Sequence, residues 1–116
     1  MNEWAQKWMK QADADYKAVL VNKKNKRFEW ACFAAQQSAE KYLKAFLFNQ
    51  GQRVVTTHSL RKLIEEAADH EQRFRALDNQ AKLLDNFYYA TRYPDALPDD
   101  TPADFFGDED ATKALN

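Results

Sequence analysis

The chain has 116 residues, of which 45% are hydrophobic, 30% charged and 14% aromatic, with two glycines, three prolines and one cysteine. Two glycines are too few for a glycine-rich phosphate loop, a collagen repeat or a strand-rich chain with many tight turns. A single cysteine excludes an intrachain disulfide framework and a cysteine-based zinc site. The length fits one domain, which buries roughly two thirds of the surface of its unfolded chain.

The net charge of −1 hides an asymmetry along the chain. Residues 1–94 contain 16 Lys and Arg against 11 Asp and Glu, a net +5, whereas residues 95–116 contain seven acidic residues and one lysine, a net −6. A mildly basic body with an acidic tail allows a polyanionic partner without requiring one. The longest mostly apolar run, residues 30–39, is too short to span a membrane, and no signal-peptide pattern is present. We therefore expect a cytoplasmic protein with no membrane partner.

Apolar residues at helical spacing predict two long helices in the first half of the chain. The first covers residues 2–22 and contains no glycine or proline. A basic turn at residues 23–27 separates it from a second helix over residues 28–49. The apolar face of this second helix is unusually broad, which indicates that it is central in the fold or also faces a second subunit. Gly51, just beyond its end, is typical of a helix stop.

Two further helices follow in the second half. The third is predicted over residues 58–70, with Thr57 as its N-cap. The fourth is predicted over residues 74–91. It must end near there, because Pro94 disfavours the helical conformation at Tyr93.

The C-terminal part of the chain is predicted to be less regular. Residues 93–107 contain all three prolines and are expected to form a loop. Residues 108–116 begin a fifth helix that is too short to be stable unless it docks on the rest of the protein. The predicted fold is a single all-α domain over residues 1–116, an antiparallel up-and-down four-helix bundle with a short or truncated fifth helix.

Few residues have the spacing of a metal centre or a nucleophile. His58 and His70 lie twelve residues apart and outside any paired-ligand motif. Glu65 and Asp69 are one helical turn apart, which is more typical of a solvated face than of a metal site. Cys32 lies within an apolar helix face and is predicted to be a packed thiol. No metal and no cofactor are predicted.

Basic side chains offer two places for an anion. The turn at residues 23–27 has the charge to contact phosphate, although a solvated corner is the favoured interpretation. On the second helix, Lys41 and Lys44 form a polar stripe with Gln37 and Glu40. This stripe is equally consistent with the solvent edge of an amphipathic helix and with a ligand-facing groove.

The segment at residues 88–95 combines aromatic rings, a guanidinium and a carboxylate at the end of the fourth helix. Arg92 can bind a phosphate through two hydrogen bonds, Tyr93 can stack on a base, and Asp95 can orient either of them. Residue types alone favour an alternative in which Arg92 pairs with Asp95 and the tyrosines fill gaps between helices.

Four stretches of the chain, in order, match the pattern of one helical family. They are the run WACFAAQQSAEKYLKA at residues 30–45, Thr57-His58-Ser59-Leu60, Arg92-Tyr93-Pro94-Asp95 and, more loosely, Trp8, Ala12 and Asp15. Together they resemble the HEPN (higher eukaryotes and prokaryotes nucleotide-binding) domain proteins, in the branch with an Arg-Tyr-Pro-Asp motif. The resemblance implies an α-helical bundle that commonly forms a homodimer and is often encoded beside a minimal nucleotidyltransferase.

Many proteins of this family are metal-independent ribonucleases that act as toxins or in phage defence. Their motif is an arginine followed, after four to six residues, by a histidine. The arginine neutralises the scissile phosphate and the histidine moves the proton of the attacking 2′-hydroxyl. The matching arginine here is Arg92, but Leu97, Pro98 and Asp99 occupy the three positions at which the histidine is expected. The family's tyrosine two residues beyond that histidine is also missing.

A second pair has the bare spacing of the motif. Arg53 is followed by His58 after four residues, but both precede the third helix, whereas the family has its motif after the fourth. A two-residue pattern with a flexible gap arises easily by chance. His58 is therefore interpreted as a residue at the start of a helix.

Three functions are consistent with these features. The leading hypothesis is a HEPN-type homodimer with little or no catalytic activity that binds nucleotide or RNA, alongside a minimal nucleotidyltransferase in a toxin–antitoxin or defence-type system. Its binding residues would be Arg92, Tyr93 and Asp95, with Lys41, Lys44 or His58 lining the cleft. The second hypothesis is a ribonuclease toxin in which His58 or a histidine-free mechanism replaces the missing base. The third is a purely structural interaction module that uses the broad second helix.

Overall fold

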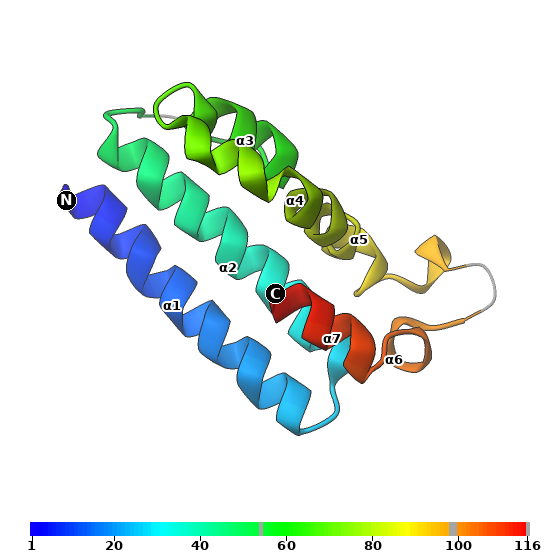
Figure 1. Cartoon of the computed structure of the whole chain (residues 1–116). Helices are drawn as coiled ribbons and strands as arrows, with labels where there is room; N and C mark the ends of the chain where they lie inside the picture. Colours follow the sequence, from blue (N-terminus) through cyan, green and yellow to red (C-terminus); the bar gives the residue numbers. More distant parts are fainter. Residues whose placement is uncertain (54, 98–99, 116) are drawn as a thin grey trace.

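A computed structural model of the chain describes residues 1–53, 55–97 and 100–115. All the regular elements in these residues are helical, which confirms the predicted fold class (Figure 1). Positions 54, 98–99 and 116 belong to the predicted connection, loop and fifth helix, and they lie outside the described residues.

The first two helices form a long antiparallel pair, α1 (Glu3–Lys24) and α2 (Phe28–Asn49) (Figure 1). The side-chain oxygen of Asn2 accepts a hydrogen bond from the backbone N–H of Ala5 at 2.8 Å and so caps α1. Helix α1 starts one residue later and ends two residues later than predicted, and α2 has the predicted bounds. Gly51, just after α2, has a φ of +95°, a conformation that glycine adopts without strain.

Helix α3 (Leu60–Ala68) begins two residues later than predicted, and its N-cap is Ser59 rather than Thr57. The hydroxyl of Ser59 accepts from the N–H of Lys62 at 3.4 Å. The hydroxyl of Thr57 instead accepts from the N–H of Ser59 at 3.1 Å. The prediction of Thr57 as the cap was wrong because several consecutive polar residues in this segment are able to fill the role.

The stretch predicted as one fourth helix consists of three elements: the 3₁₀ helix η1 (Gln72–Leu77), α4 (Asp78–Asp85) and α5 (Phe87–Ala90). The backbone remains helical at Asn86, with φ −65° and ψ −21°, so α4 and α5 are nearly continuous. The prediction of a single α-helix from residue 74 was wrong at its start, where the 3₁₀ helix η1 lies instead. A 3₁₀ helix has three residues per turn, and an α-helical spacing does not persist through it.

The C-terminal segment has more structure than the predicted loop. It contains the 3₁₀ turn η2 (Pro94–Ala96), α6 (Pro102–Phe105) and α7 (Asp108–Leu115). Helix α7 packs against α2, as expected for a helix that is too short to be stable alone, and its residue Ala111 is completely buried. A salt bridge of 3.1 Å between Lys23 and Asp108 also joins it to the end of α1.

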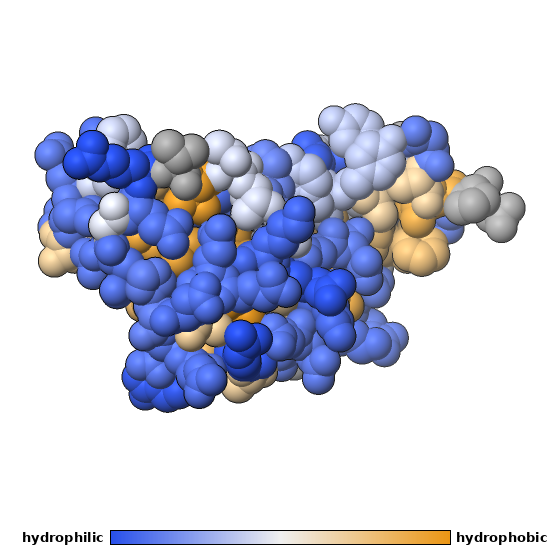
Figure 2. Space-filling view, turned by 90° about the horizontal axis from the view of Figure 1, so that it is seen from above, coloured by the Kyte–Doolittle hydropathy of each residue, from blue (hydrophilic) through white to orange (hydrophobic). Residues whose placement is uncertain are grey.

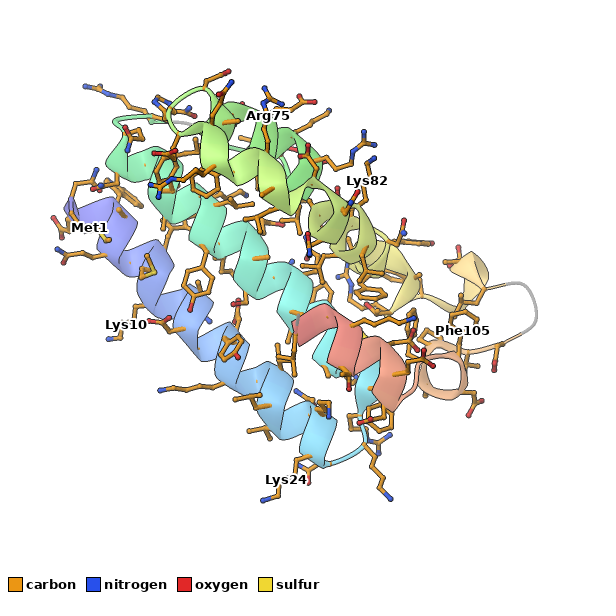
Figure 3. All side chains as sticks on the ribbon, in the orientation of Figure 1. Met1, Lys10, Lys24, Arg75, Lys82 and Phe105 are labelled. Atoms are coloured by element: carbon orange, nitrogen blue, oxygen red, sulfur yellow. The ribbon has the colours of Figure 1, made fainter. Side chains whose placement is uncertain are left out.

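Helix α2 is the centre of the molecule, because it contacts α1 on one side and α3, α4, α5, α6 and α7 on the other. This explains its broad apolar face. The largest buried apolar side chains are Val19, Leu43, Leu47, Leu60, Leu63, Ile64, Leu84, Phe87 and Phe106. Hydrophilic residues cover most of the face seen in Figure 2, and charged side chains such as Lys10 and Lys24 project outward from α1 in Figure 3. Among the described residues, no helix has the length and apolar character needed to cross a bilayer.

Candidate functional site

Arg92 lies at the end of α5 among three aromatic rings. The carbon Cζ of its guanidinium is 4.3 Å from the ring centroid of Phe33, 4.9 Å from that of Tyr88 and 5.1 Å from that of Tyr93. Its Nε and Nη2 donate to the carbonyl oxygen of Tyr88 at 3.0 and 2.7 Å. A guanidinium has five N–H donors, and within the described residues the other three have no acceptor. The side chain is thus fixed in position with donors left for a ligand.

Asp95 contacts Tyr89 rather than Arg92. The Tyr89 hydroxyl donates to the Asp95 carboxylate, with both oxygens 2.7 Å away, and this carboxylate raises the pKa of Tyr89. The Tyr89 ring in turn stacks on Tyr93 at 4.6 Å. The predicted contact between Asp95 and Arg92 is therefore corrected. Asp95 positions Tyr93 through Tyr89, whereas the Tyr88 carbonyl and the three rings position Arg92.

His58 contacts the same tyrosine, Tyr88, that Arg92 contacts, although its sequence position indicated only a helix start. Its imidazole stacks on Tyr88 with a centroid distance of 5.1 Å and an interplanar angle of 24°. Its Nδ1 is 3.2 Å from both carboxylate oxygens of Glu40, and its side chain is 56% exposed. Because a carboxylate accepts hydrogen bonds, Nδ1 is the donor, and in the neutral imidazole Nε2 is then the acceptor. His58 and Arg92, 34 positions apart, both contact the ring of Tyr88.

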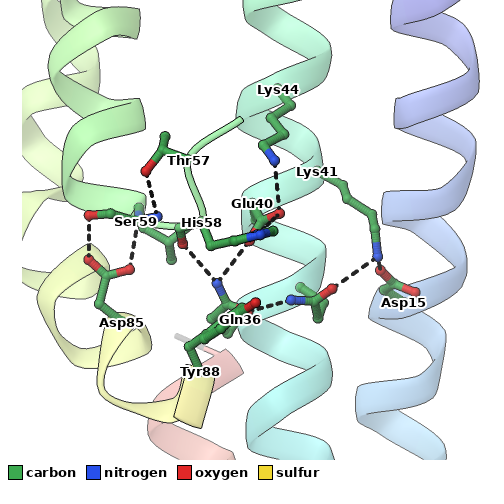
Figure 4. A network of polar contacts seen from close by, with 12 residues as sticks. Asp15, Gln36, Glu40, Lys41, Lys44, Thr57, His58, Ser59, Asp85 and Tyr88 are labelled. Carbon is green, nitrogen blue, oxygen red and sulfur yellow. Dashed lines mark hydrogen bonds and ion pairs between the residues drawn. The ribbon is translucent and has the colours of Figure 1, made fainter. Parts of the chain in front are cut away.

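Behind His58, α2 contributes a buried polar network (Figure 4). Glu40 and Lys44 form a 3.1 Å ion pair in which each side chain is only 4% exposed. The amide nitrogen of Gln36 donates to Glu40 at 3.2 Å and to the carbonyl oxygen of His58 at 3.3 Å. The sequence reasoning missed Gln36 and Glu40 as a buried pair. The sequence did contain a signal for this network. Gln36, Glu40 and Lys44 follow one another at intervals of four residues within an otherwise apolar helix face.

The two lysines of the predicted polar stripe point to different partners. Lys44 is committed to the buried pair with Glu40. Lys41 reaches across to Asp15 on α1 and lies 3.4 Å from the side-chain oxygen of Gln37 (Figure 4). The stripe is therefore a polar seam between α2 and its neighbours, with each ammonium group already neutralised by a carboxylate.

The other candidate residues do not contact Arg92, His58 or Tyr88. No group of three or more His, Cys, Asp or Glu side chains that could hold a metal occurs among the described residues. Cys32 is completely buried, and burial, with smaller contributions from Asp110 and Glu29, raises the pKa of its thiol to about 12. His70 packs against the ring of Phe46 at 6.2 Å. Leu97 is partly buried against the core.

The fold and the site define an all-helical bundle in which an arginine held by aromatic rings and an oriented histidine contact the same tyrosine. The family model of the HEPN domain matches residues 5–116, and the chain belongs to the HEPN family. This confirms the family to which the sequence was predicted to belong.

Two solved structures are similar over nearly the whole chain. The crystal structure of TT1696 from Thermus thermophilus has a TM-score of 0.92 and 34% sequence identity, and the match covers 98% of this chain and 89% of that one. ST0689, described as an archaeal HEPN homologue, has a TM-score of 0.79 and 30% identity, with 99% and 88% covered. A comparison with curated proteins found no match.

Proposed function

We propose that this HEPN-domain protein binds the phosphate of a nucleotide or of RNA at Arg92. The observation that supports this most strongly is the fixed guanidinium, which has three N–H donors without an acceptor within the described residues. Such a fork matches two phosphate oxygens, and the fixed geometry lowers the entropic cost of binding. Membership of the HEPN family agrees with a ligand of this class.

The neighbouring side chains have separate roles in this proposal. Tyr93, 44% exposed, stacks on the base, and Asp95 keeps it in place through Tyr89. His58, which stacks on Tyr88, is a further side chain near the ligand. Lys41 and Lys44 support the site through their ion pairs rather than contacting the ligand. We further propose that the protein acts as a homodimer with a minimal nucleotidyltransferase, in a toxin–antitoxin or defence-type system.

Calorimetry with ATP, GTP and a short RNA tests the binding role of Arg92. We expect Arg92→Ala to weaken binding roughly 10- to 100-fold, because charged hydrogen bonds contribute about 1.5–3 kcal/mol. Arg92→Lys retains the charge but loses the paired N–H donors. Its affinity should therefore lie between that of the unsubstituted protein and that of Arg92→Ala. Arg73→Ala is the matched control, because Arg73 is exposed and pairs with Glu71, away from Arg92 and its aromatic partners. Unchanged affinity in Arg92→Ala would instead favour a purely structural interaction module.

A second candidate function is metal-independent RNA cleavage, and the position of His58 favours it. Its Nε2 is free to accept a proton while Glu40 holds Nδ1, as a general base requires, and Arg92 lies on the same Tyr88 ring. The test is incubation of transfer RNA and total RNA with the protein in the presence of a chelator. Cleavage that both His58→Ala and Arg92→Ala abolish would support the nuclease. No cleavage by the unsubstituted protein would leave binding alone.

A further inference from the structure

A second aromatic site lies at the other end of α1 and α2. Trp4 and Trp8 of α1 surround Phe48 of α2, with centroid distances of 6.4 and 5.5 Å. Together with Gln52 and Arg53 they line a hollow of about 540 Å³. Trp4 is 65% exposed, so most of its ring is available to a ligand.

The charge around this hollow suits an anionic ligand. The ammonium group of Lys7 lies 5.5 Å from the Trp4 centroid. Arg53 is exposed and has no ion-pair partner among the described residues. Aromatic rings flanked by cations are the pattern that binds unpaired bases and their phosphates.

Two further hollows follow this site along α1 and α2, and each shares a lining residue with the one before it. Trp8 also lines a hollow of about 230 Å³ that includes Lys7 and Lys41. Lys41 also lines a third, of about 540 Å³, that includes Phe33, the ring on which Arg92 stacks. Phe33 and Phe48 are 15 residues apart on α2, so this strip is about 22 Å long. This strip is longer than a single nucleotide and fits a strand of several nucleotides.

We propose that Trp4, Phe48 and Arg53 form a second nucleobase subsite, and that a single-stranded RNA lies along the α1–α2 seam between it and Arg92. A base stacks on Trp4 while Arg53 binds an adjoining phosphate. Single-stranded RNA fits better than a duplex, whose bases are not free to stack on side chains. This inference rests on the proposed function, because Arg92 is the other end of the strip.

Fluorescence anisotropy with a labelled ten-nucleotide oligouridine tests this subsite, with uridine monophosphate as the short probe. We expect Trp4→Ala to weaken decamer binding about tenfold and to leave the affinity for the monophosphate unchanged. Arg53→Gln should reduce the slope of log affinity against log salt by about 0.7, the value for one phosphate contact on a single strand. Both positions are exposed, and unchanged circular dichroism melting will show that the variants fold.

Tyr16→Ala and Arg75→Gln are the matched controls, because both side chains are exposed and line none of the three hollows. Arg75 projects from η1, away from α1 (Figure 3). Decamer binding that Arg92→Ala abolishes but neither Trp4→Ala nor Arg53→Gln affects would overturn the second subsite and leave the proposed function intact. Absence of binding to either probe in the unsubstituted protein would overturn both. A dimer that Trp4→Ala converts to monomer in sedimentation would assign this face to a second copy of the chain instead.

Discussion

At the scale of single residues, the carboxylate of Glu40 is the most connected group near the site. It receives hydrogen bonds from Lys44, His58 and Gln36 while remaining almost fully buried. Removing a carboxylate from water costs several kcal/mol, and only well-placed partners offset this. Glu40 therefore depends on its partners, and His58 depends on Glu40 for its orientation.

Replacement of one member of the buried ion pair should be far more damaging than replacement of both. We expect Glu40→Leu to reduce the free energy of unfolding by about 3–5 kcal/mol, because Lys44 is left as an unpaired buried charge. The double variant Glu40→Leu with Lys44→Met should recover much of this loss. Urea unfolding measures all the variants, with the exposed Glu66→Leu as a control. Additive losses in the double variant would contradict the predicted coupling.

Cys32 gives a prediction about pH. Its thiol has a pKa of about 12 in the folded protein, against an ordinary value of 9.0, chiefly because it is buried. Below pH 9 the thiol is protonated in both states. Between pH 9 and about 12 the unfolded chain loses the thiol proton while the folded chain keeps it. The free energy of unfolding therefore falls as the pH rises, by about 1.4 kcal/mol per pH unit.

Cys32→Ala should therefore behave differently at two pH values. At pH 8 we expect it to be less stable than the unsubstituted protein by about 1–2 kcal/mol, the cost of a small cavity. At pH 10 that difference should nearly disappear, because only the protein with the thiol loses stability through its ionisation. Urea unfolding at both pH values is the measurement, and the tyrosines affect both proteins alike. A difference that stays constant would mean that the thiol ionises normally.

At the scale of elements, the start of α3 is stabilised by a residue from a different helix. The carboxylate of Asp85, at the end of α4, accepts from the N–H groups of Leu60 and Arg61 at 2.6 and 3.2 Å and from the Ser59 hydroxyl at 3.3 Å. These N–H groups have no partner within their own helix. The negative charge also interacts favourably with the helix dipole.

Loss of this tertiary cap should destabilise the whole bundle. We expect Asp85→Ala to reduce the free energy of unfolding by about 1–2 kcal/mol, the usual range for a helix cap. Ser59→Ala, which removes the 3.4 Å bond from Lys62 and the 3.3 Å bond to Asp85, should cost less, because Asp85 still accepts from Leu60 and Arg61. Asp69→Ala serves as the control, because Asp69 is exposed at the other end of α3. Equal stability of the Asp85 and Asp69 variants in thermal or urea unfolding would show that this cap contributes little.

The same elements show what the sequence could and could not predict. Helices α1 and α2 were predicted to within two residues, because their apolar spacing persists over six turns. The contribution of Asp85 to the cap of α3 was not predicted, since it comes from 25 positions away. Residue types made Arg92 a candidate for phosphate binding, although they favoured its pairing with Asp95. They could not place it against Phe33, because that contact exists only once α5 packs on α2.

At the scale of the whole molecule, the C-terminal segment is part of the core rather than an appendage. Phe106 is 5% exposed and meets the ring of Phe87 edge to face at 5.7 Å. Ala111 packs completely within the same core cluster. The segment is strongly acidic, and its docking brings Asp108 to Lys23 on the basic body. A short helix that is unstable alone is thus held mainly by apolar contacts.

Two adjacent phenylalanines test whether this segment belongs to one cooperative unit. We expect Phe106→Ala to reduce the free energy of unfolding by about 3–5 kcal/mol, as for other buried phenylalanines, and to lower the melting temperature by roughly 12–20 °C. Phe105→Ala is the control, because that ring is 54% exposed, and it should cost less than about 1 kcal/mol. Circular dichroism melting and urea titration measure both. If Phe106→Ala melted at the temperature of the unsubstituted protein, the segment would unfold independently. A single transition at a lower temperature is expected, because Phe106 and Phe87 belong to one contiguous core.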